Sequence, residues 1–157
     1  LRGTVTESVA ATFTAAEISV PRDINNRLLF DIDEVRLHVA VPTKAVGADT
    51  YADALVQVVL SDDEPTAPLT FDNPKLLAQY YLRSIYDATD MIKLFQDPAS
   101  PAHWETRNYA NYIPDDKVWL VVDGFANTVA LTATCKIIGS LAKVSLEDFQ
   151  ALVLSRL

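Results

Sequence analysis

The sequence is poor in the residues that build most catalytic and metal centres. Among its 157 residues it has one cysteine, Cys135, two histidines, His38 and His103, and four glycines. One cysteine excludes an intrachain disulfide framework and a cysteine-rich zinc site, and two histidines cannot form a three-histidine zinc centre. Neither a glycine-rich phosphate loop nor a Gly-x-Ser-x-Gly nucleophile turn occurs. We therefore expect a protein that is not an enzyme and that holds no metal and no cofactor.

Positive charge is also scarce. The chain has 13 Lys and Arg residues against 21 Asp and Glu residues, for a formal net charge of −8. The basic residues are scattered along the sequence, whereas nucleic-acid-binding proteins usually carry a basic arm or stripe that neutralises phosphates. We expect no direct nucleic-acid binding. The longest apolar runs, such as VWLVV at 118–122, are too short for a transmembrane segment.

What the sequence does contain is short stretches in which apolar and polar residues alternate, a pattern typical of half-buried strands. Prolines separate these stretches, and no regular strand–helix–strand alternation supports a parallel sheet. The connections at 61–74 and 97–115 are too long for simple hairpins and favour crossings between two sheets. The sequence predicts one all-β domain over residues 1–157, a jelly-roll-like antiparallel sandwich of about eight strands with a short C-terminal helix. Periodicity alone does not separate jelly-roll from immunoglobulin-like strand order.

Two local patterns predict features inside this sandwich. In residues 28–33 the apolar side chains fall on even positions, and from 35 to 41 they fall on odd positions. This change of parity predicts a bulge near Asp33 and Glu34, because one extra residue restores the inward face. Further on, the segment DGFAN joins two strands: its dipeptide Asp123-Gly124 is typical of a tight turn, and the alternative is a longer loop that includes Phe125 to Asn127.

The strongest helix signal lies at the C-terminus, over about 145–156. Ser145 and Asp148 have the spacing of a capping box, and Val144 and Phe149 have that of a hydrophobic staple. Apolar residues then recur at helical spacing, and the contact candidates among them are Leu146, Phe149 and Val153. A short helix with one apolar face has to bury it, so we expect this face to dock on a sheet edge or on a neighbouring subunit.

Two further groups have functional interpretations. Asp31 and Asp33 have the spacing of a carboxylate pair for sugar hydrolysis or calcium binding, but they also fit the solvated face of a strand, which is the interpretation we favour. The loop segment HWETRNYANYI combines aromatic and arginine side chains, the types enriched at interface hot spots. Its candidates are Trp104, Arg107, Tyr109 and Tyr112. These rings could form subunit contacts, stack on a sugar, or fold back into the core.

The order of elements resembles that of the single-jelly-roll capsid proteins of tailless icosahedral viruses. The resemblance is carried by GTVTESVAATFTAAEISVP, by the long strand RLLFDIDEVRLHVAVP, and by the late pair KVWLVVDGFANTVALTATCKII followed by the helix. It implies a structural protein of the virion that self-assembles into an icosahedral shell with copies of itself and other capsid proteins. Many such proteins have a basic N-terminal arm, but this chain begins LRGTVTES. In such a shell, either another component contacts the genome or an internal membrane lies between this protein and the genome.

The alternative function is a carbohydrate-binding β-sandwich module that uses the aromatic loop at 103–112 as its platform. A weaker third hypothesis is a β-sandwich enzyme that uses Asp31 and Asp33.

Overall fold

The computed structural model describes residues 1–43, 51–69, 73, 75–87, 90–97 and 112–154. Within this part of the chain there are nine strands followed by one helix. Their bounds are β1 (Arg2–Thr6), β2 (Phe13–Ser19), β3 (Leu28–Val39), β4 (Tyr51–Ser61), β5 (Leu76–Asp87), β6 (Asp90–Asp97), β7 (Tyr112–Ile113), β8 (Lys117–Phe125), β9 (Thr132–Lys143) and α1 (Leu146–Leu154).

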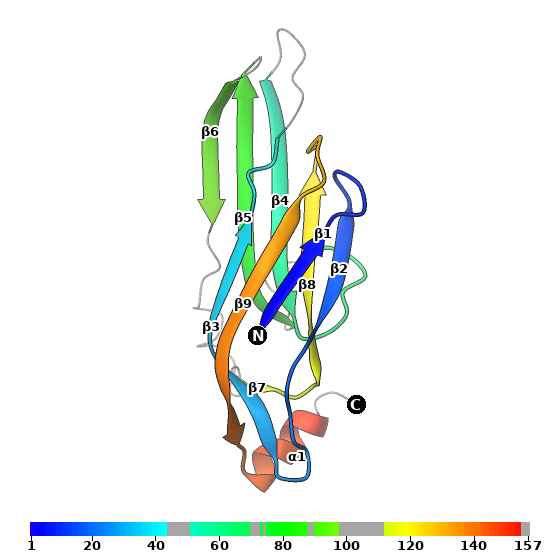
Figure 1. Cartoon of the computed structure of the whole chain (residues 1–157), viewed down its shortest axis with the longest axis vertical. Helices are drawn as coiled ribbons and strands as arrows, with labels where there is room; N and C mark the ends of the chain where they lie inside the picture. The colour runs from blue at the N-terminus through cyan, green and yellow to red at the C-terminus, as the bar shows by residue number, and fades with distance from the viewer. Residues whose placement is uncertain (44–50, 70–72, 74, 88–89, 98–111, 155–157) are drawn as a thin grey trace.

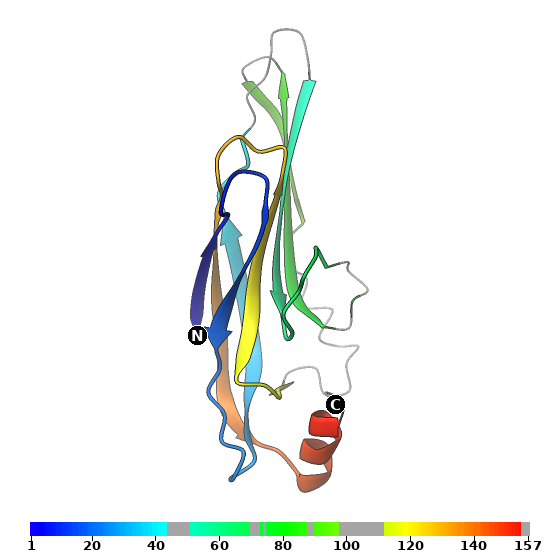
Figure 2. The ribbon, with the colours of Figure 1, turned by 90° about the vertical axis from the view of Figure 1, so that its right-hand side faces the viewer.

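The strands form two antiparallel sheets that lie face to face (Figure 1). One has four strands in the order β1-β9-β3-β7, and the other has five in the order β2-β8-β4-β5-β6. Figure 2 shows the two layers edge-on, with α1 at the lower end of the four-stranded sheet, on the side that faces the other layer. The predicted all-β sandwich with a short C-terminal helix is confirmed.

The strand order is that of a jelly roll. With β6 set aside, the remaining eight strands pair first with last and inward from there: β1 with β9, β2 with β8, β3 with β7, and β4 with β5. The pairings of β3 with β9 and of β4 with β8 then join these four strand pairs into the two sheets. An immunoglobulin-like sandwich keeps its first two strands in one sheet, whereas here β1 and β2 lie in different sheets. Strand β6 extends the five-stranded sheet beyond the eight-strand pattern.

The core lies between the sheets and follows from the alternation along each strand, since successive side chains point to opposite faces. In β4, for example, Val56, Val58 and Leu60 are fully buried in the main apolar cluster. Cys135 on β9 is buried in the same cluster, and burial raises the pKa of its thiol to about 12. The cysteine is therefore a small apolar core residue with a protonated thiol at neutral pH.

The predicted bulge is present. The pairing of β3 with β9 shifts register between Ile32 and Glu34, which leaves Asp33 as the extra residue. Gly139 of β9 lies opposite Ile32, and a Cβ atom at Gly139 would overlap the backbone carbonyl of Asp31. The glycine allows the two backbones to approach closely beside the bulge.

The predicted turn at Asp123-Gly124 is wrong. Both residues belong to β8, which continues to Phe125, and the chain reverses after it, where Ala126 has a φ of 59°. The dipeptide lies inside a strand because Gly124 gives space to other side chains rather than a positive φ. A Cβ atom there would overlap the side chains of Glu7 and Asn127.

Candidate contact surfaces

The C-terminal helix begins as the sequence predicts. The hydroxyl of Ser145 donates a hydrogen bond of 2.6 Å to Oδ2 of Asp148, and the backbone N–H of Asp148 donates one of 3.1 Å to Oγ of Ser145. Val144, directly before the cap, is buried in the cluster against which Phe149 packs. These contacts fix the direction in which α1 leaves β9.

The apolar face of α1 packs against other residues of the same chain. Leu29 of β3, Val144 and Leu152 form a small buried cluster, and the partly buried rings of Tyr112 and Phe149 pack against it. Two of the predicted contact residues, Tyr112 and Phe149, therefore contribute to the fold of the chain itself.

The other predicted contact residues lie elsewhere. Leu146 is 55% exposed and is free to contact another molecule. The side chain of Val153 lies outside the described residues, as do Trp104, Arg107 and Tyr109. Their proposed role in contacts stays a prediction.

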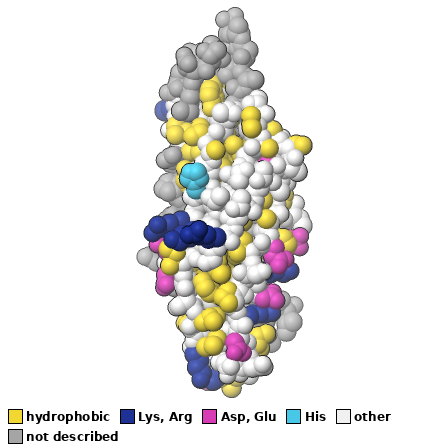
Figure 3. All heavy atoms as spheres, viewed as in Figure 1, with side chains coloured by type: hydrophobic (Ala, Val, Ile, Leu, Met, Phe, Trp, Pro, Cys, Tyr) yellow, Lys and Arg dark blue, Asp and Glu magenta, His cyan; other side chains and the backbone are white. Residues whose placement is uncertain are grey.

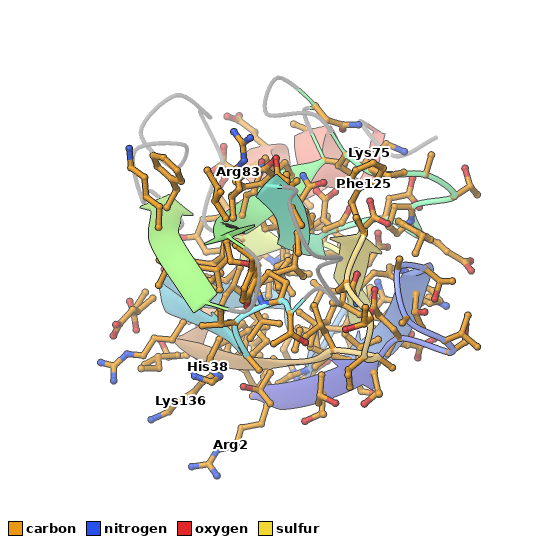
Figure 4. All side chains as sticks on the ribbon, turned by 90° about the horizontal axis from the view of Figure 1, so that it is seen from above. Arg2, His38, Lys75, Arg83, Phe125 and Lys136 are labelled. Atoms are coloured by element: carbon orange, nitrogen blue, oxygen red, sulfur yellow. The ribbon has the colours of Figure 1, made fainter. Side chains whose placement is uncertain are left out.

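A row of side chains on the outer face of the five-stranded sheet was not found from the sequence. Phe125 of β8 pairs with Leu55 of β4, Leu55 pairs with Arg83 of β5, and Arg83 pairs with Phe95 of β6. Residues paired in this way point to the same face of a sheet. The neighbouring Val56 of β4 points into the core, so this row, called the outer row below, points away from it. Figure 4 shows Arg83 and Phe125 on one side of the molecule, with Arg2, His38 and Lys136 on the opposite side.

Three of the four members of the outer row are apolar, and its two phenylalanines are exposed. Phe125 is 68% exposed and Phe95 is 41% exposed, whereas Leu55 between them is half-buried. Two exposed phenylalanines in a row that spans four strands form a surface of the kind that marks contact sites. The row could not be read from sequence spacing because its members come from four separate strands.

The one charged member of the row is held in place. Nε of Arg83 donates to both carboxylate oxygens of Asp53 at 3.0 Å, and this hydrogen bond, with the charge of Asp53, raises the pKa of Arg83. Its guanidinium lies 6.0 Å from the centroid of the Phe95 ring, and Nζ of Lys93 lies 4.5 Å from the same centroid. Two cations therefore border the exposed Phe95 ring.

The carboxylates of Asp31 and Asp33 on β3 lie beside the bulge. Asp31 is half-buried, and its pKa is raised first by burial and then by the charge of Asp33, the exposed residue of the bulge. In the part of the chain that the structure describes, no group of three or more His, Cys, Asp and Glu side chains is arranged to hold a metal ion. Nothing in this arrangement adds to the enzymatic interpretation.

A buried carboxylate, Glu7, joins the loops at the upper end of the sandwich. Its Oε1 accepts hydrogen bonds from the backbone N–H groups of Thr12 at 3.1 Å and Gly124 at 2.9 Å. Its Oε2 accepts one from Nδ2 of Asn127 at 2.7 Å and one from the N–H of Leu131 at 2.8 Å. Four donors around one carboxylate tie the β1–β2 connection to the β8–β9 connection. Three of its four partners lie more than 100 residues away in the sequence, so no local motif indicates this role.

Asp123 lies near Glu7, and both burial and the charge of Glu7 raise its pKa above 3.8. The unfolded chain then loses this proton at a lower pH than the folded chain. The stability that Asp123 contributes below about pH 3.8 is lost as the pH rises through the folded-state pKa of this carboxyl group.

We expect Asp123→Asn to raise the melting temperature at pH 7 and to have no such effect at pH 3. The exposed Glu64→Gln is the control, and thermal melts at both pH values are the measurement. An equal effect of Asp123→Asn at both pH values would contradict this account.

No protein-family model and no curated protein matches the sequence. None of the described residues form a helix with the length and apolar character that a membrane crossing requires. Function has to be argued from the surfaces of the sandwich, because a fold by itself does not define one.

Proposed function

We propose that this chain is a viral structural protein, a capsid subunit of the virion that assembles with copies of itself and other capsid proteins into an icosahedral shell without catalysis. Two features support the proposal. The jelly-roll strand order is common to viral capsid domains, although lectins and cupins share it. The outer row then favours self-association over the other uses of this fold.

The exposure of Phe125 is the observation that carries the proposal. A large aromatic side chain that is 68% exposed on a regular strand contributes little to the stability of the isolated subunit. It lies in one row with Leu55, Arg83 and Phe95, so a partner that covers it can bury a strip that is apolar except for Arg83. The strip includes Arg83 and two phenylalanines, and aromatic residues and arginine are enriched at interfaces.

The carbohydrate-binding alternative has less support from the described residues. Of its platform, Tyr112 packs against the cluster beside α1, and its other rings lie outside the described part of the chain. The platform therefore remains a prediction from the sequence.

Phe125→Ser is expected to reduce assembly strongly while leaving the fold intact. The side chain is exposed in the subunit, so the melting temperature of unassembled protein should change little, whereas the contact loses its most exposed aromatic group. The measurement is the assembled fraction by size-exclusion chromatography with light scattering. Val129→Ser is the matched control, because Val129 is 61% exposed but lies outside the outer row, in the β8–β9 connection. Equal assembly of the two variants would show that the outer row is not a contact.

A further inference from the structure

The four-stranded sheet has a row of basic side chains on its outer face. Lys136 of β9 lies directly opposite Arg2 of β1 on one side and Arg36 of β3 on the other, and all three side chains are exposed. We call these three residues the basic row. Figure 3 shows Lys and Arg side chains as a band across this face, with a histidine side chain above them. Arg2 and Lys136 stand near opposite ends of the sequence, so only the fold brings this charge together.

The basic row is electrostatically unfavourable in an isolated subunit. Adjacent strands are about 4.8 Å apart, and like charges directly opposite each other on a sheet are destabilising. Nε and Nη2 of Arg36 donate to the two carboxylate oxygens of Glu34 at 2.6 and 3.1 Å. This hydrogen bond lowers the pKa of Glu34, as do the charges of Arg36 and Lys136, so one carboxylate partly compensates two of the three bases. Among the described residues, neither Arg2 nor Lys136 has a carboxylate within salt-bridge distance. Three bases side by side are unexpected in a chain with 21 acidic and 13 basic residues. Such a local conflict is typical of a functional surface.

The side chains beside the basic row are also hydrogen-bond donors. The next cross-strand row consists of Thr4, Thr134 and His38, all exposed, and the one after it pairs Thr6 with Thr132. The nearby acids, Asp33 and Glu34, lie at the bulge of β3, on the side of Arg36 that is away from His38. Cations and hydroxyl groups on one flat face match a partner that presents oxygen acceptors and negative charge.

We propose that the basic row binds a carboxylate-bearing surface of a second copy of this chain. This inference rests on the proposed self-assembly. The net charge of −8 means that the surface of a second copy outside this row is on balance acidic, which gives charge complementarity. A two-fold axis through the basic row would place the row against itself and repel. We take the contact to be heterologous, between the basic row of one copy and a different surface of the next, and this geometry builds rings or larger assemblies rather than dimers.

A phosphodiester backbone is the other acceptor that such a face could bind. Three bases, one of them already paired with Glu34, are fewer than the roughly 6–10 phosphate contacts of proteins that bind nucleic acid strongly. The observations therefore favour the second copy.

Lys136→Glu tests the proposal, with Lys143→Glu as the matched control on the same strand. Both lysines are exposed, but Lys143 pairs with Leu28 at the lower end of β9, outside the basic row. We expect Lys136→Glu to lower the assembled fraction at least tenfold at low salt and Lys143→Glu to leave it near that of the unmodified protein. Light scattering gives the fraction, and circular dichroism checks that both variants fold. Assembly of Lys136→Glu at the unmodified level would overturn the inference.

Zero-length carbodiimide crosslinking of particles grown from mixed ¹⁴N- and ¹⁵N-labelled protein identifies the partner. Crosslinks from Lys136 to a carboxylate on a chain with the other label support the contact. If particles form but Lys136 is crosslinked only within its own chain, this inference is overturned and the proposed shell function survives. The inference is also overturned if a single-stranded oligonucleotide binds the unmodified protein but not Lys136→Glu, while Lys136→Glu assembles normally. The partner of the basic row would then be phosphate. Failure of the unmodified protein to assemble at any salt concentration overturns the shell function and this inference together.

Discussion

Glu7→Gln is expected to lower the melting temperature by about 6–12 °C. The amide puts an N–H₂ group where one carboxylate oxygen stood, so two of the four donors lose their acceptor and face another donor: either Thr12 and Gly124, or Asn127 and Leu131. Buried donors left without partners cost about 1–3 kcal/mol each, so a loss of about 3 kcal/mol is a conservative sum. In a domain of this size each kcal/mol corresponds to about 2–4 °C.

The change is nearly isosteric, so packing is not the cause of the loss. Glu17→Gln is the control, because Glu17 is exposed on β2 and its carboxylate lies 3.4 Å from Nζ of Lys117 in a surface ion pair of little energetic value. Thermal unfolding followed by circular dichroism at pH 7 compares the two variants. If Glu7→Gln has the same melting temperature as the unmodified protein, the Glu7 carboxylate does not hold the β1–β2 and β8–β9 connections together.

Gly139→Ala is expected to destabilise the sandwich by about 3 kcal/mol, the upper end of the cost of overpacking. The added methyl group would overlap the backbone carbonyl of Asp31 and contact the ring of Phe30. A flexible side chain can move aside, but a carbonyl in a paired strand cannot move without shifting the β3–β9 register at the bulge. Chemical denaturation gives the free energy of unfolding.

Ser140→Ala provides the comparison, since Ser140 is the next residue on β9 and is exposed. It should change the free energy of unfolding by less than about 0.5 kcal/mol. A Gly139→Ala protein as stable as Ser140→Ala would mean that β3 and β9 do not approach as closely as the structure shows.

The features that the sequence predicts correctly depend on local patterns. The change of apolar parity located the bulge beside Asp33, because a strand with one buried face has to keep that face inward. Ser145 and Asp148 predicted the start of α1, because a capping box needs only residues three apart. The β-sandwich follows from alternation, but the jelly-roll order does not, because strand pairing joins residues from opposite ends of the chain.

The features that the sequence does not show depend on strand register. Asp123-Gly124 has the composition of a turn, and it lies within β8 because the glycine makes room for Glu7, a residue of the β1–β2 region. The basic residues are scattered in sequence, and the fold then places Arg2 opposite Lys136. The outer row draws on four strands in the same way.

The two outer faces of the sandwich differ in chemistry, and this difference bears on assembly. The five-stranded sheet presents the apolar outer row, and the four-stranded sheet presents the basic row on the opposite side (Figure 4). In the proposed assembly the two faces take different partner surfaces, so each copy contacts at least two neighbours. Unlike contacts of this kind form rings if their geometry closes and open filaments if it does not, rather than isolated dimers.

Particle size of the unmodified protein tests the central claim most directly. Dynamic light scattering of purified protein over a range of concentrations and salt, followed by electron microscopy of the same samples, gives the size and regularity of what forms. The account predicts large, closed and regular particles of constant size, whose amount rises with protein concentration and falls with salt. A monomer at every concentration and salt condition would contradict it.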